Sequence, residues 1–349
     1  MTIAPSRTLP DLAPPPGLAI EEASRLCAGT SAPEPPVARA VPRTTTIHGD
    51  TRIDDYFWLR NREDPETLAY LEAENRYTQA VMRGTEVLQE RLFAEMRGRI
   101  KETDLSVPER IDGWLYYHRT EEGAQYPIYC RQPVERPAGD AAAEEVLLDL
   151  NPLAEGHAYF RLGAFEPSPD HRMLAYAVDT SGAEAFTLYV RELATGALLA
   201  ETISNVSPSV AWANDSRTLL YIVLDEARRP CRLFRHVLGA NPAEDALVHF
   251  EADESFFLDV SRTRSQAYLL LEMSSHSTSE VRFVSADRPE EPFRVVEPRR
   301  AGIEYTLSHH GDRFFIATND RAPNFRLVSA PVTDPTREHW TEVLPHRPA

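Results

Sequence analysis

Two aspartates, Asp170 and Asp215, have sequence surroundings that would suit catalytic acids, because they lie in Ser-Pro-Asp and Asn-Asp-Ser segments. A carboxylate in such a segment can act as a general acid or base. The two residues are also 45 positions apart, and a run rich in β-branched and aromatic residues follows each of them. Aspartates at such points commonly accept hydrogen bonds from the backbone of a turn. We therefore predict that both residues stabilise turns.

Two other groups contain side chains that can bind metals, and three further residues could contact a substrate. A metal site needs ligands that converge at about 2 Å, and the spacing of these groups does not indicate convergence. We predict that both groups lie in solvated loops and that no metal is bound. The groups are His309 with His310, and Glu251 with Asp253 and Glu254. A substrate-cavity role is the less favoured alternative to a structural role for three residues: His118, Arg119 and Arg131.

A serine nucleophile is often presented by a Gly-x-Ser-x-Gly motif, in which a strained turn between a strand and a helix exposes the hydroxyl. The 349 residues do not contain this motif. The nearest match is Gly29–Pro33, where Ser31 lacks the second glycine and lies in a Pro-rich segment. The sequence also lacks Gly-x-Gly-x-x-Gly and phosphate-loop motifs. We predict no catalytic residue and no cofactor site in this chain.

The elements that carry these residues are repeated. Phe165–Val178 returns 45 residues later as Val210–Val223, so that Asp, Arg, Leu and Tyr recur in register. Each copy is a polar turn followed by a short apolar run, which predicts a strand. A second predicted strand follows each copy, at Phe186–Arg191 and at Cys231–His236. A repeat of this length with several strands in each unit is typical of a β-propeller blade.

Looser copies extend the series in both directions. The turn and strand recur at Asp112–Tyr117 upstream, and around Leu269 and Ile316 downstream. We count five units between about residues 110 and 344, where the last outer strand is predicted at Trp340–Leu344. A β-sandwich has similar strand spacing, but it gives no reason for four residue types to repeat in register. Further second strands are predicted at Tyr126–Arg131, Glu280–Val284 and Asn324–Val328.

Composition excludes some classes of function. The formal net charge of -17 argues against nucleic acid as a partner, since phosphate binding requires a basic face. An acidic protein can attract basic substrates, although acidity also serves solubility alone. No apolar run approaches the roughly 20 residues needed to cross a bilayer, and the N-terminus lacks a signal-peptide pattern. We expect no membrane partner and a cytoplasmic location. The three cysteines, at 27, 130 and 231, are expected to be free thiols.

Three regions are predicted: a disordered Pro- and Ala-rich extension over 1–42, an extended segment with two helices over 43–104, and a propeller over 105–349. Leu18–Cys27 could form a short helix in the extension, and Thr44–Leu59 is expected to be extended. Asp64 and Pro65 predict the start of the first helix. Its apolar face contains Tyr70, Ala73, Tyr77 and Ala80 or Val81.

The second helix is expected to begin after Gly84, with Thr85 as its cap. Its apolar line contains Leu88, Leu92, Met96 and Ile100. Both helical faces require cover from another body. The sheet units offer no obvious place for them. Pro133–Glu145 is predicted to be a surface loop in the first unit.

Several motifs together resemble the opening half of the prolyl oligopeptidase family of serine peptidases, and most closely its oligopeptidase B branch. The resemblance covers residues 42–344. The first motifs are His48-Gly49, Asp54 or Asp55, Tyr56-x-Trp58-Leu59, Asp64-Pro65, Leu71 and Glu74-Asn75. The later motifs are Tyr126–Arg131, Trp212–Ser216 and Thr278–Arg282.

The resemblance implies a seven-bladed propeller above an α/β-hydrolase domain that cleaves short peptides after Arg or Lys with a Ser-Asp-His triad. We accordingly expect a mainly β fold: an incomplete propeller of about five of the seven blades, preceded by the extended segment and two helices. The hydrolase domain, normally in the same chain, would cover the helices, and the propeller would limit access to the site. This chain alone is expected to be inactive. The alternative is a stand-alone, non-enzymatic propeller that binds peptides or proteins.

Overall fold

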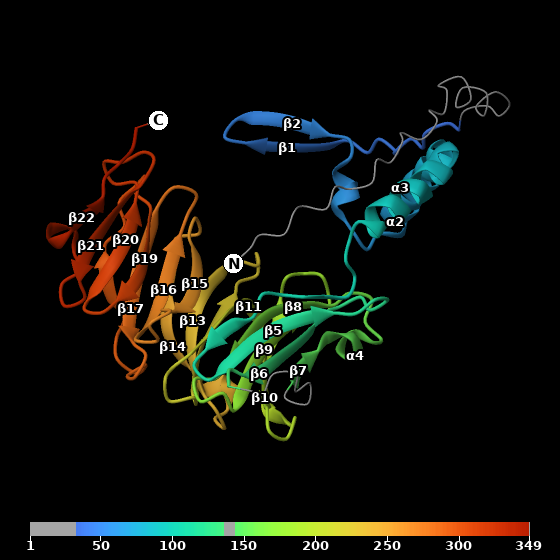
Figure 1. Ribbon diagram of the computed structural model, residues 1–349. Coiled ribbons are helices and arrows are strands. Elements are labelled where there is room, and N and C mark those ends of the chain that lie inside the picture. Colours follow the sequence, from blue (N-terminus) through green and yellow to red (C-terminus); the bar gives the residue numbers. More distant parts are fainter. Residues whose placement is uncertain (1–32, 136–143, 349) are drawn as a thin grey trace. The chain divides into compact units, whose positions relative to one another are not determined.

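The computed structural model describes residues 33–135 and 144–348, and the chain divides into two compact units, one ending at Lys101 and the other beginning at Glu102 (Figure 1). The first contains a hairpin and two helices. The second consists of antiparallel sheets, so the predicted mainly β fold is confirmed. The possible helix at 18–27 and most of the predicted loop at 133–145 lie outside the described residues. No helix in the described ranges is long and apolar enough to cross a bilayer.

The first unit opens with a β-hairpin formed by β1 (Arg43–Ile47) and β2 (Asp50–Asp54). Its two turn residues, His48 and Gly49, have φ angles of 52° and 82°. Two consecutive positive φ values define a type I′ turn, whose twist matches that of the flanking strands. The prediction of one continuous extended segment over 44–59 is therefore wrong, because this turn reverses the chain. The short helix η1 (Phe57–Arg60) follows.

The helix α2 (Pro65–Met82) begins as the sequence predicts. The Asp64 carboxylate accepts a hydrogen bond from the Glu66 backbone N–H at 2.8 Å, and Pro65 occupies the first turn. The turn η2 (Arg83–Thr85) then separates α2 from α3 (Glu86–Gly98). Thr85 is the N-cap residue of α3, as predicted, but its side chain forms no capping hydrogen bond, because the hydroxyl donates to the Met82 carbonyl at 2.7 Å. Thr85 lies in nearly helical backbone, so its side chain bonds backward, to the preceding turn.

The predicted apolar line of α3 is exposed: Leu92 keeps 45% of its surface accessible and Met96 keeps 59%. No residue of α3 is buried, and Thr67 is the one buried residue of α2. Aromatic residues in the segment before α2 form local contacts within the first unit. The Trp58 indole N–H donates to the Arg39 carbonyl at 2.9 Å.

The second unit begins with an antiparallel sheet of five strands. Its strands are β3 (Asp104–Leu105), β4 (Glu109–Ile111), β5 (Trp114–Thr120), β6 (Ile128–Pro133) and β7 (Glu145–Asp149). Both β3 and β4 pair with β5, and the remaining strands form a meander. The short helix α4 (Leu150–Ala154) leads to the next sheet.

A seven-stranded sheet follows, in which the strands pair in chain order from β8 to β14. Its first four strands are β8 (Arg161–Pro167), β9 (Met173–Asp179), β10 (Phe186–Glu192) and β11 (Leu198–Trp212). The others are β12 (Thr218–Leu224), β13 (Pro230–Val237) and β14 (Ala246–Phe250), with the turn η4 (Pro242–Glu244) between the last two. The 15-residue β11 is both the last strand of one four-stranded unit and the first strand of the next, with a register shift between Val206 and Val210.

Two four-stranded meanders complete the unit. One contains β15 (Phe257–Arg262), β16 (Tyr268–Ser274), β17 (Ser279–Ser285) and β18 (Arg294–Glu297). The other contains β19 (Tyr305–His310), β20 (Arg313–Thr318), β21 (Arg326–Pro331) and β22 (Thr341–Leu344), with η5 (Arg337–His339) before the last strand. The predicted outer strand at 340–344 is thus confirmed as β22, which pairs with β21.

The sequence repeat has a direct structural counterpart. Tyr176 and Tyr189 lie opposite each other on β9 and β10, with ring centroids 5.6 Å apart. Their equivalents one repeat later, Tyr221 and Phe234, are opposite on β12 and β13 at 5.7 Å. Stacked aromatic pairs across antiparallel strands stabilise a sheet. Five first-to-second strand turns also share one residue with positive φ: Asp112, His171, Ser216, Gln266 and Gly311.

Apolar cores lie between consecutive four-stranded units of the sheet region. One core joins β5 and β7 to β9, and another joins β9 and β10 to β11 and β12. Two more join β12 and β13 to β15 and β16, and β16 and β17 to β20 and β21. Packing of successive sheets face to face is the arrangement of propeller blades. The largest fully buried side chains include Trp212, Phe186 and Phe314.

Candidate functional site

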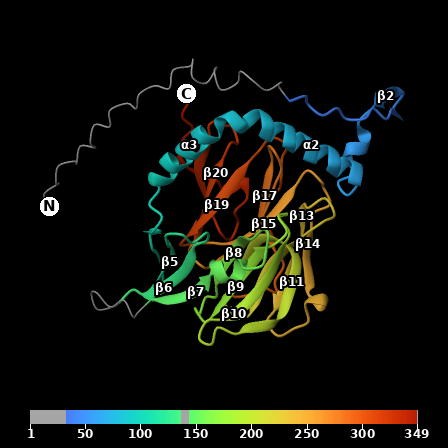
Figure 2. The same ribbon diagram turned by 90° about the vertical axis from the view of Figure 1, so that its right-hand side faces the viewer.

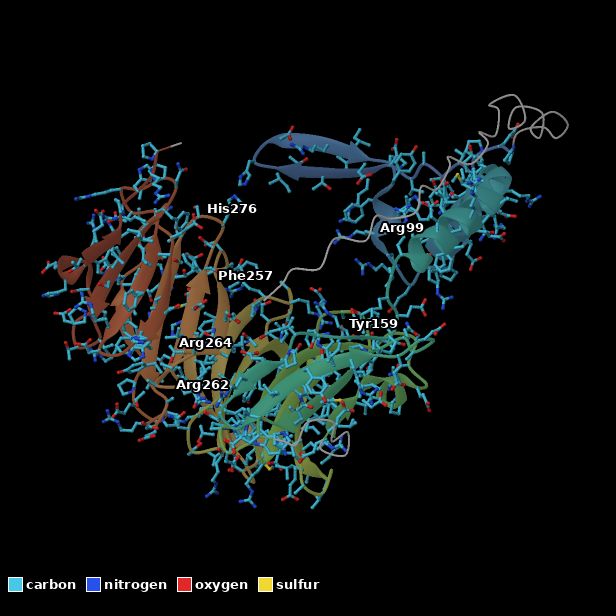
Figure 3. The ribbon with its side chains drawn as sticks, viewed as in Figure 1. Arg99, Tyr159, Phe257, Arg262, Arg264 and His276 are labelled. Atoms are coloured by element: carbon cyan, nitrogen blue, oxygen red, sulfur yellow. The ribbon has the colours of Figure 1, made fainter. Side chains whose placement is uncertain are left out.

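The antiparallel meanders give the sheet unit two structurally distinct ends. We call the end where the chain passes from one four-stranded unit to the next the linker end. The turns between second and third strands also lie there, and the turns between first and second strands lie at the opposite end. Figure 3 labels Phe257 and His276 at the linker end, and Arg262 and Arg264 at the opposite end of β15.

The first strands of the units lie toward the middle of the sheet unit. Figure 2 shows β8, β15 and β19 on the inside and β10 and β14 farther out. Trp212 connects the first strands β11 and β8, because its indole N–H donates a hydrogen bond to the Glu166 carbonyl at 2.8 Å. Gly163 on β8 lies so close to the Phe186 ring that a Cβ there would approach it to 2.4 Å. Close packing thus fixes the position of β8.

Three acidic side chains lie on the inner strands or on the strand next to one, and we call them the inner carboxylates: Glu166 on β8, Asp259 on β15 and Glu272 on β16. The surrounding protein raises the pKa of all three, and that of Glu166 to about 7. Glu166 and Asp259 nevertheless remain exposed to solvent. These carboxyl groups are accessible to solvent, and the surrounding protein disfavours their charged form. A cationic ligand would favour that charged form, so the groups are well placed to bind one.

Asp259 and Glu272 are directly opposite each other in the β15–β16 ladder. Two like charges in such a pair destabilise a sheet, and the Asp259 charge further raises the pKa of Glu272. One neutral donor reaches the pair, since the Ser209 hydroxyl donates to Asp259. A positively charged group of a ligand would relieve this repulsion.

Arg262 lies at the other end of β15, and its positive charge acts on Glu166. It lowers the pKa of Glu166, although the desolvation by surrounding protein has the larger, opposite effect. Its guanidinium donates to the Asn214 side chain and to Gln266 Oε1 at 3.3 Å. Burial lowers the pKa of Arg262, and the carboxylates of Asp112, Asp287 and Glu166 oppose that shift. Charges from several sheets therefore interact at the inner strands.

The two aspartates that the repeat singled out stabilise turns, as predicted. Asp170 accepts the Arg172 backbone N–H at 3.1 Å, and Asp215 accepts the Arg217 N–H at 2.9 Å. Asp215 also accepts from the backbone N–H and the hydroxyl of Thr218. Because these donors favour the charged form, the pKa of each aspartate is lowered despite partial burial.

The prediction of solvated loops is correct for Asp253 and Glu254, which are exposed in the segment after β14, and wrong for Glu251 and the two histidines. Glu251 is buried and forms an ion pair with Arg299 at 2.6 Å. His309 and His310 lie on strand β19, where the His309 ring packs against Tyr268. Among the residues that the structure describes, no three His, Cys, Asp or Glu side chains converge to bind a metal.

The residues considered for a substrate cavity have structural contacts. Arg131 is 7% exposed, stacks over the Trp114 ring at 3.9 Å and pairs with Glu145 at 2.7 Å. Arg119 pairs with Glu144 at 3.0 Å, and the His118 ring packs against Tyr129. The favoured structural role is consistent with these contacts. Cys130 and Cys231 are buried free thiols, as expected, whereas Cys27 lies outside the described residues.

A serine and a histidine that the sequence did not single out meet at the opposite end. The Ser265 hydroxyl is 2.7 Å from His309 Nδ1. A catalytic triad needs a carboxylate on the other imidazole nitrogen, but His309 Nε2 is buried without a partner in the described part of the chain. Burial also lowers the pKa of His309, which makes it a weaker base. This pair has the geometry of a structural contact.

The sheet topology and the first-strand arrangement define a β-propeller. Residues 35–349 match the family described as "Prolyl oligopeptidase, N-terminal beta-propeller domain". The chain is 41% identical over 332 residues to dipeptidyl aminopeptidase BI of Pseudoxanthomonas mexicana, and 37% identical over 302 residues to protease 2 of Moraxella lacunata. These alignments cover 91% and 86% of this chain but 46% and 44% of the relatives.

Solved structures give the same result. Oligopeptidase B from Leishmania major superimposes with a TM-score of 0.84 at 30% identity, over 91% of this chain and 47% of that structure. Oligopeptidase B from Trypanosoma brucei gives a TM-score of 0.81, also at 30% identity. The chain belongs to the prolyl oligopeptidase family, as its N-terminal propeller part, and resembles oligopeptidase B. It spans about half the length of these relatives.

Proposed function

We propose that this chain is the propeller part of a serine peptidase that hydrolyses short peptides after Arg or Lys. The observation that carries the proposal is the similarity of residues 35–349 to the oligopeptidase propellers. The inner carboxylates support the basic specificity, because exposed carboxylates on the inner strands would attract cationic side chains. We infer that the propeller limits which peptides reach the catalytic groups.

In this proposal, residues 1–42 form an extension, residues 43–104 dock on the hydrolase domain and residues 105–349 form part of the propeller. The exposed apolar line of α3 supports the docking role, since such a face normally packs against another body. The Ser-Asp-His triad would belong to the hydrolase domain, and the chain of 349 residues would be inactive alone. A cytoplasmic location also remains a prediction.

The test compares the chain of 349 residues with the longer protein that includes the C-terminal half. Chromogenic substrates ending in arginine, lysine or alanine are supplied to both. We expect the longer protein to cleave the basic substrates at least about 100-fold more efficiently, as kcat/KM, than the alanyl substrate. The shorter chain should give no cleavage above the blank. Cleavage by the shorter chain that a serine-directed reagent abolishes would contradict the proposal.

Dipeptidyl aminopeptidase activity is a second candidate, because the relative at 41% identity bears that name. The two candidates differ in their need for a free amino terminus. An arginyl substrate with a blocked amino terminus should be cleaved under the first proposal and resist cleavage under the second.

A further inference from the structure

The linker end of the sheet unit contains an open hollow of about 750 Å³, which is within the size range of ligand pockets, roughly 300–1,000 Å³. It lies between the turn that joins β12 to β13 and the segment that joins β14 to β15. Asn205, in the middle of β11, forms a third side. The lining residues are Asn205, Leu224, Asp225, Glu226, Ala227, Arg228, Arg232 and Glu254.

A buried arginine holds the two main walls in place. The Arg229 guanidinium donates to the carbonyl oxygens of Asp253 at 2.8 Å and Phe256 at 3.1 Å, both in the segment after β14. It also pairs with Asp225 at 3.1 Å, in its own turn. Asp225 further accepts the backbone N–H groups of Ala227 and Arg229, each at 2.9 Å. The hollow is therefore formed before any ligand binds, which lowers the entropic cost of binding.

The remaining charges of the hollow are not neutralised by one another. Glu226, Arg228 and Glu254 are exposed, and none of them forms an ion pair within the described residues. Arg232 lies over the Phe250 ring at 5.4 Å. Asn205 donates its amide to the Leu224 carbonyl at 3.0 Å, which leaves its side-chain oxygen available as an acceptor. Two carboxylates from different walls and two guanidinium groups are thus available to a ligand.

We propose that this hollow binds short peptides that carry both a basic side chain and a free carboxyl terminus. Glu226 and Glu254 would accept hydrogen bonds from the basic group, and Arg228 with Arg232 would bind the terminal carboxylate. Ala227, which is exposed, supplies an apolar surface for the peptide between its charged ends. The inference rests on the proposed function for its ligand class, because it assigns a second contact site for the same kind of peptide.

Both signs of charge are needed for this assignment. A polyanion such as nucleic acid would meet the carboxylates of Asp225, Glu226 and Glu254. A simple cation would leave the two guanidinium groups without a partner. A molecule with opposite charges at its two ends satisfies every free group in the hollow.

The experiment is isothermal titration calorimetry of the 349-residue chain with the tripeptide Ala-Arg-Ala, as the free acid and as the carboxyl-terminal amide. We expect the free acid to bind about fivefold to tenfold more tightly than the amide. Arg228→Gln should abolish that difference. Glu254→Gln should weaken binding of both peptides by about the same factor.

Arg321→Gln is the matched control. Arg321 is also exposed, also has a positive φ (55°, against 68° for Arg228) and also lies in a second-to-third strand turn, but far along the chain in the last sheet. It should leave both affinities unchanged. Equal binding of the two peptides, no measurable heat with either, or equal effects of Arg228→Gln and Arg321→Gln would each overturn the assignment.

These outcomes are separate from those of the peptidase test. Binding here needs no hydrolysis and uses only the described part of the propeller. If the longer protein cleaves arginyl substrates and the tripeptide fails to bind, the assignment of a peptide site to the hollow is wrong and the proposed function stands. If the tripeptide binds as expected and no cleavage occurs, the proposed function is wrong and the hollow remains a peptide site.

Discussion

Similar apolar side chains are buried in the sheet unit and exposed in the helical unit. In the sheets, residues such as Trp212, Leu219 and Phe314 are almost completely buried between successive four-stranded units. In the helices, Leu92 and Met96 remain largely exposed. The sheet unit can therefore derive its stability from its own cores. The helical unit shows the face that its partner would cover.

The largest expected effect distinguishes the two units by stability. Trp212→Ala should lower the free energy of unfolding of the sheet unit by about 3–5 kcal/mol, because it leaves a cavity and removes the hydrogen bond to Glu166. Leu92→Ala, on the exposed face of α3, should change the free energy of unfolding by less than about 0.5 kcal/mol. Urea denaturation followed by tryptophan fluorescence and circular dichroism measures both. Similar losses for the two variants would contradict the difference in burial.

A second substitution tests how tightly the inner strand β8 packs. Gly163→Ala should cost about 1–3 kcal/mol, because the new Cβ would approach the Phe186 ring to 2.4 Å and force it to move. Gly113→Ala is the matched control, since no other atom lies within 4 Å of its new Cβ. The same denaturation experiment compares them. A neutral Gly163→Ala would mean that β8 has more space than the structure gives it.

The inner carboxylates predict a smaller effect that depends on pH. The pKa of Glu166 is raised to about 7, so the folded state holds its proton more tightly than the unfolded state. The resulting stabilisation is complete below the ordinary glutamate pKa of about 4.3. It is lost as the pH rises through about 7.

Glu166→Gln should therefore flatten the fall in the urea midpoint between about pH 4.5 and pH 7. Glu338→Gln, an exposed glutamate in η5, should leave the slope unchanged. An unchanged slope in Glu166→Gln would show that this carboxyl titrates normally.

The smallest effect on stability should accompany a clear effect on association. Replacing Leu92 and Met96 together with serine should leave the urea midpoint nearly unchanged, since both side chains are exposed. We expect the exposed apolar face to promote self-association of the isolated chain. Sedimentation velocity should therefore show less oligomer in the double variant. If the wild-type chain is already monomeric at high concentration, the exposed face does not drive association.

The sequence predicted the sheet unit well because its repeat encodes the same local structure several times. Asp, Arg, Leu and Tyr at fixed positions specify a turn, an exposed position, a core position and a stacked pair, and the structure places them so. The hairpin turn at His48 and Gly49 was missed, although a two-residue turn that ends in glycine between alternating strands is a known hairpin signal.

The candidate site was less predictable. Glu166 and Asp259 look like ordinary polar positions of strands, but desolvation by the surrounding protein raises the pKa of both. Glu251 looks like part of a solvated acidic loop, but its partner Arg299 comes from 48 residues away. Long-range partners of this kind leave no local pattern. The hollow at the linker end likewise depends on the Arg229 contacts to a distant segment.

We propose that the exposed helical face packs against the hydrolase domain of the longer protein. Amide hydrogen exchange of residues 65–98, in the 349-residue chain and in the longer protein with its C-terminal half, tests it most directly. We expect the amides of α2 and α3 to exchange much faster in the shorter chain than in the longer protein, where the hydrolase domain would protect them. Equal and slow exchange in both proteins would contradict the claim.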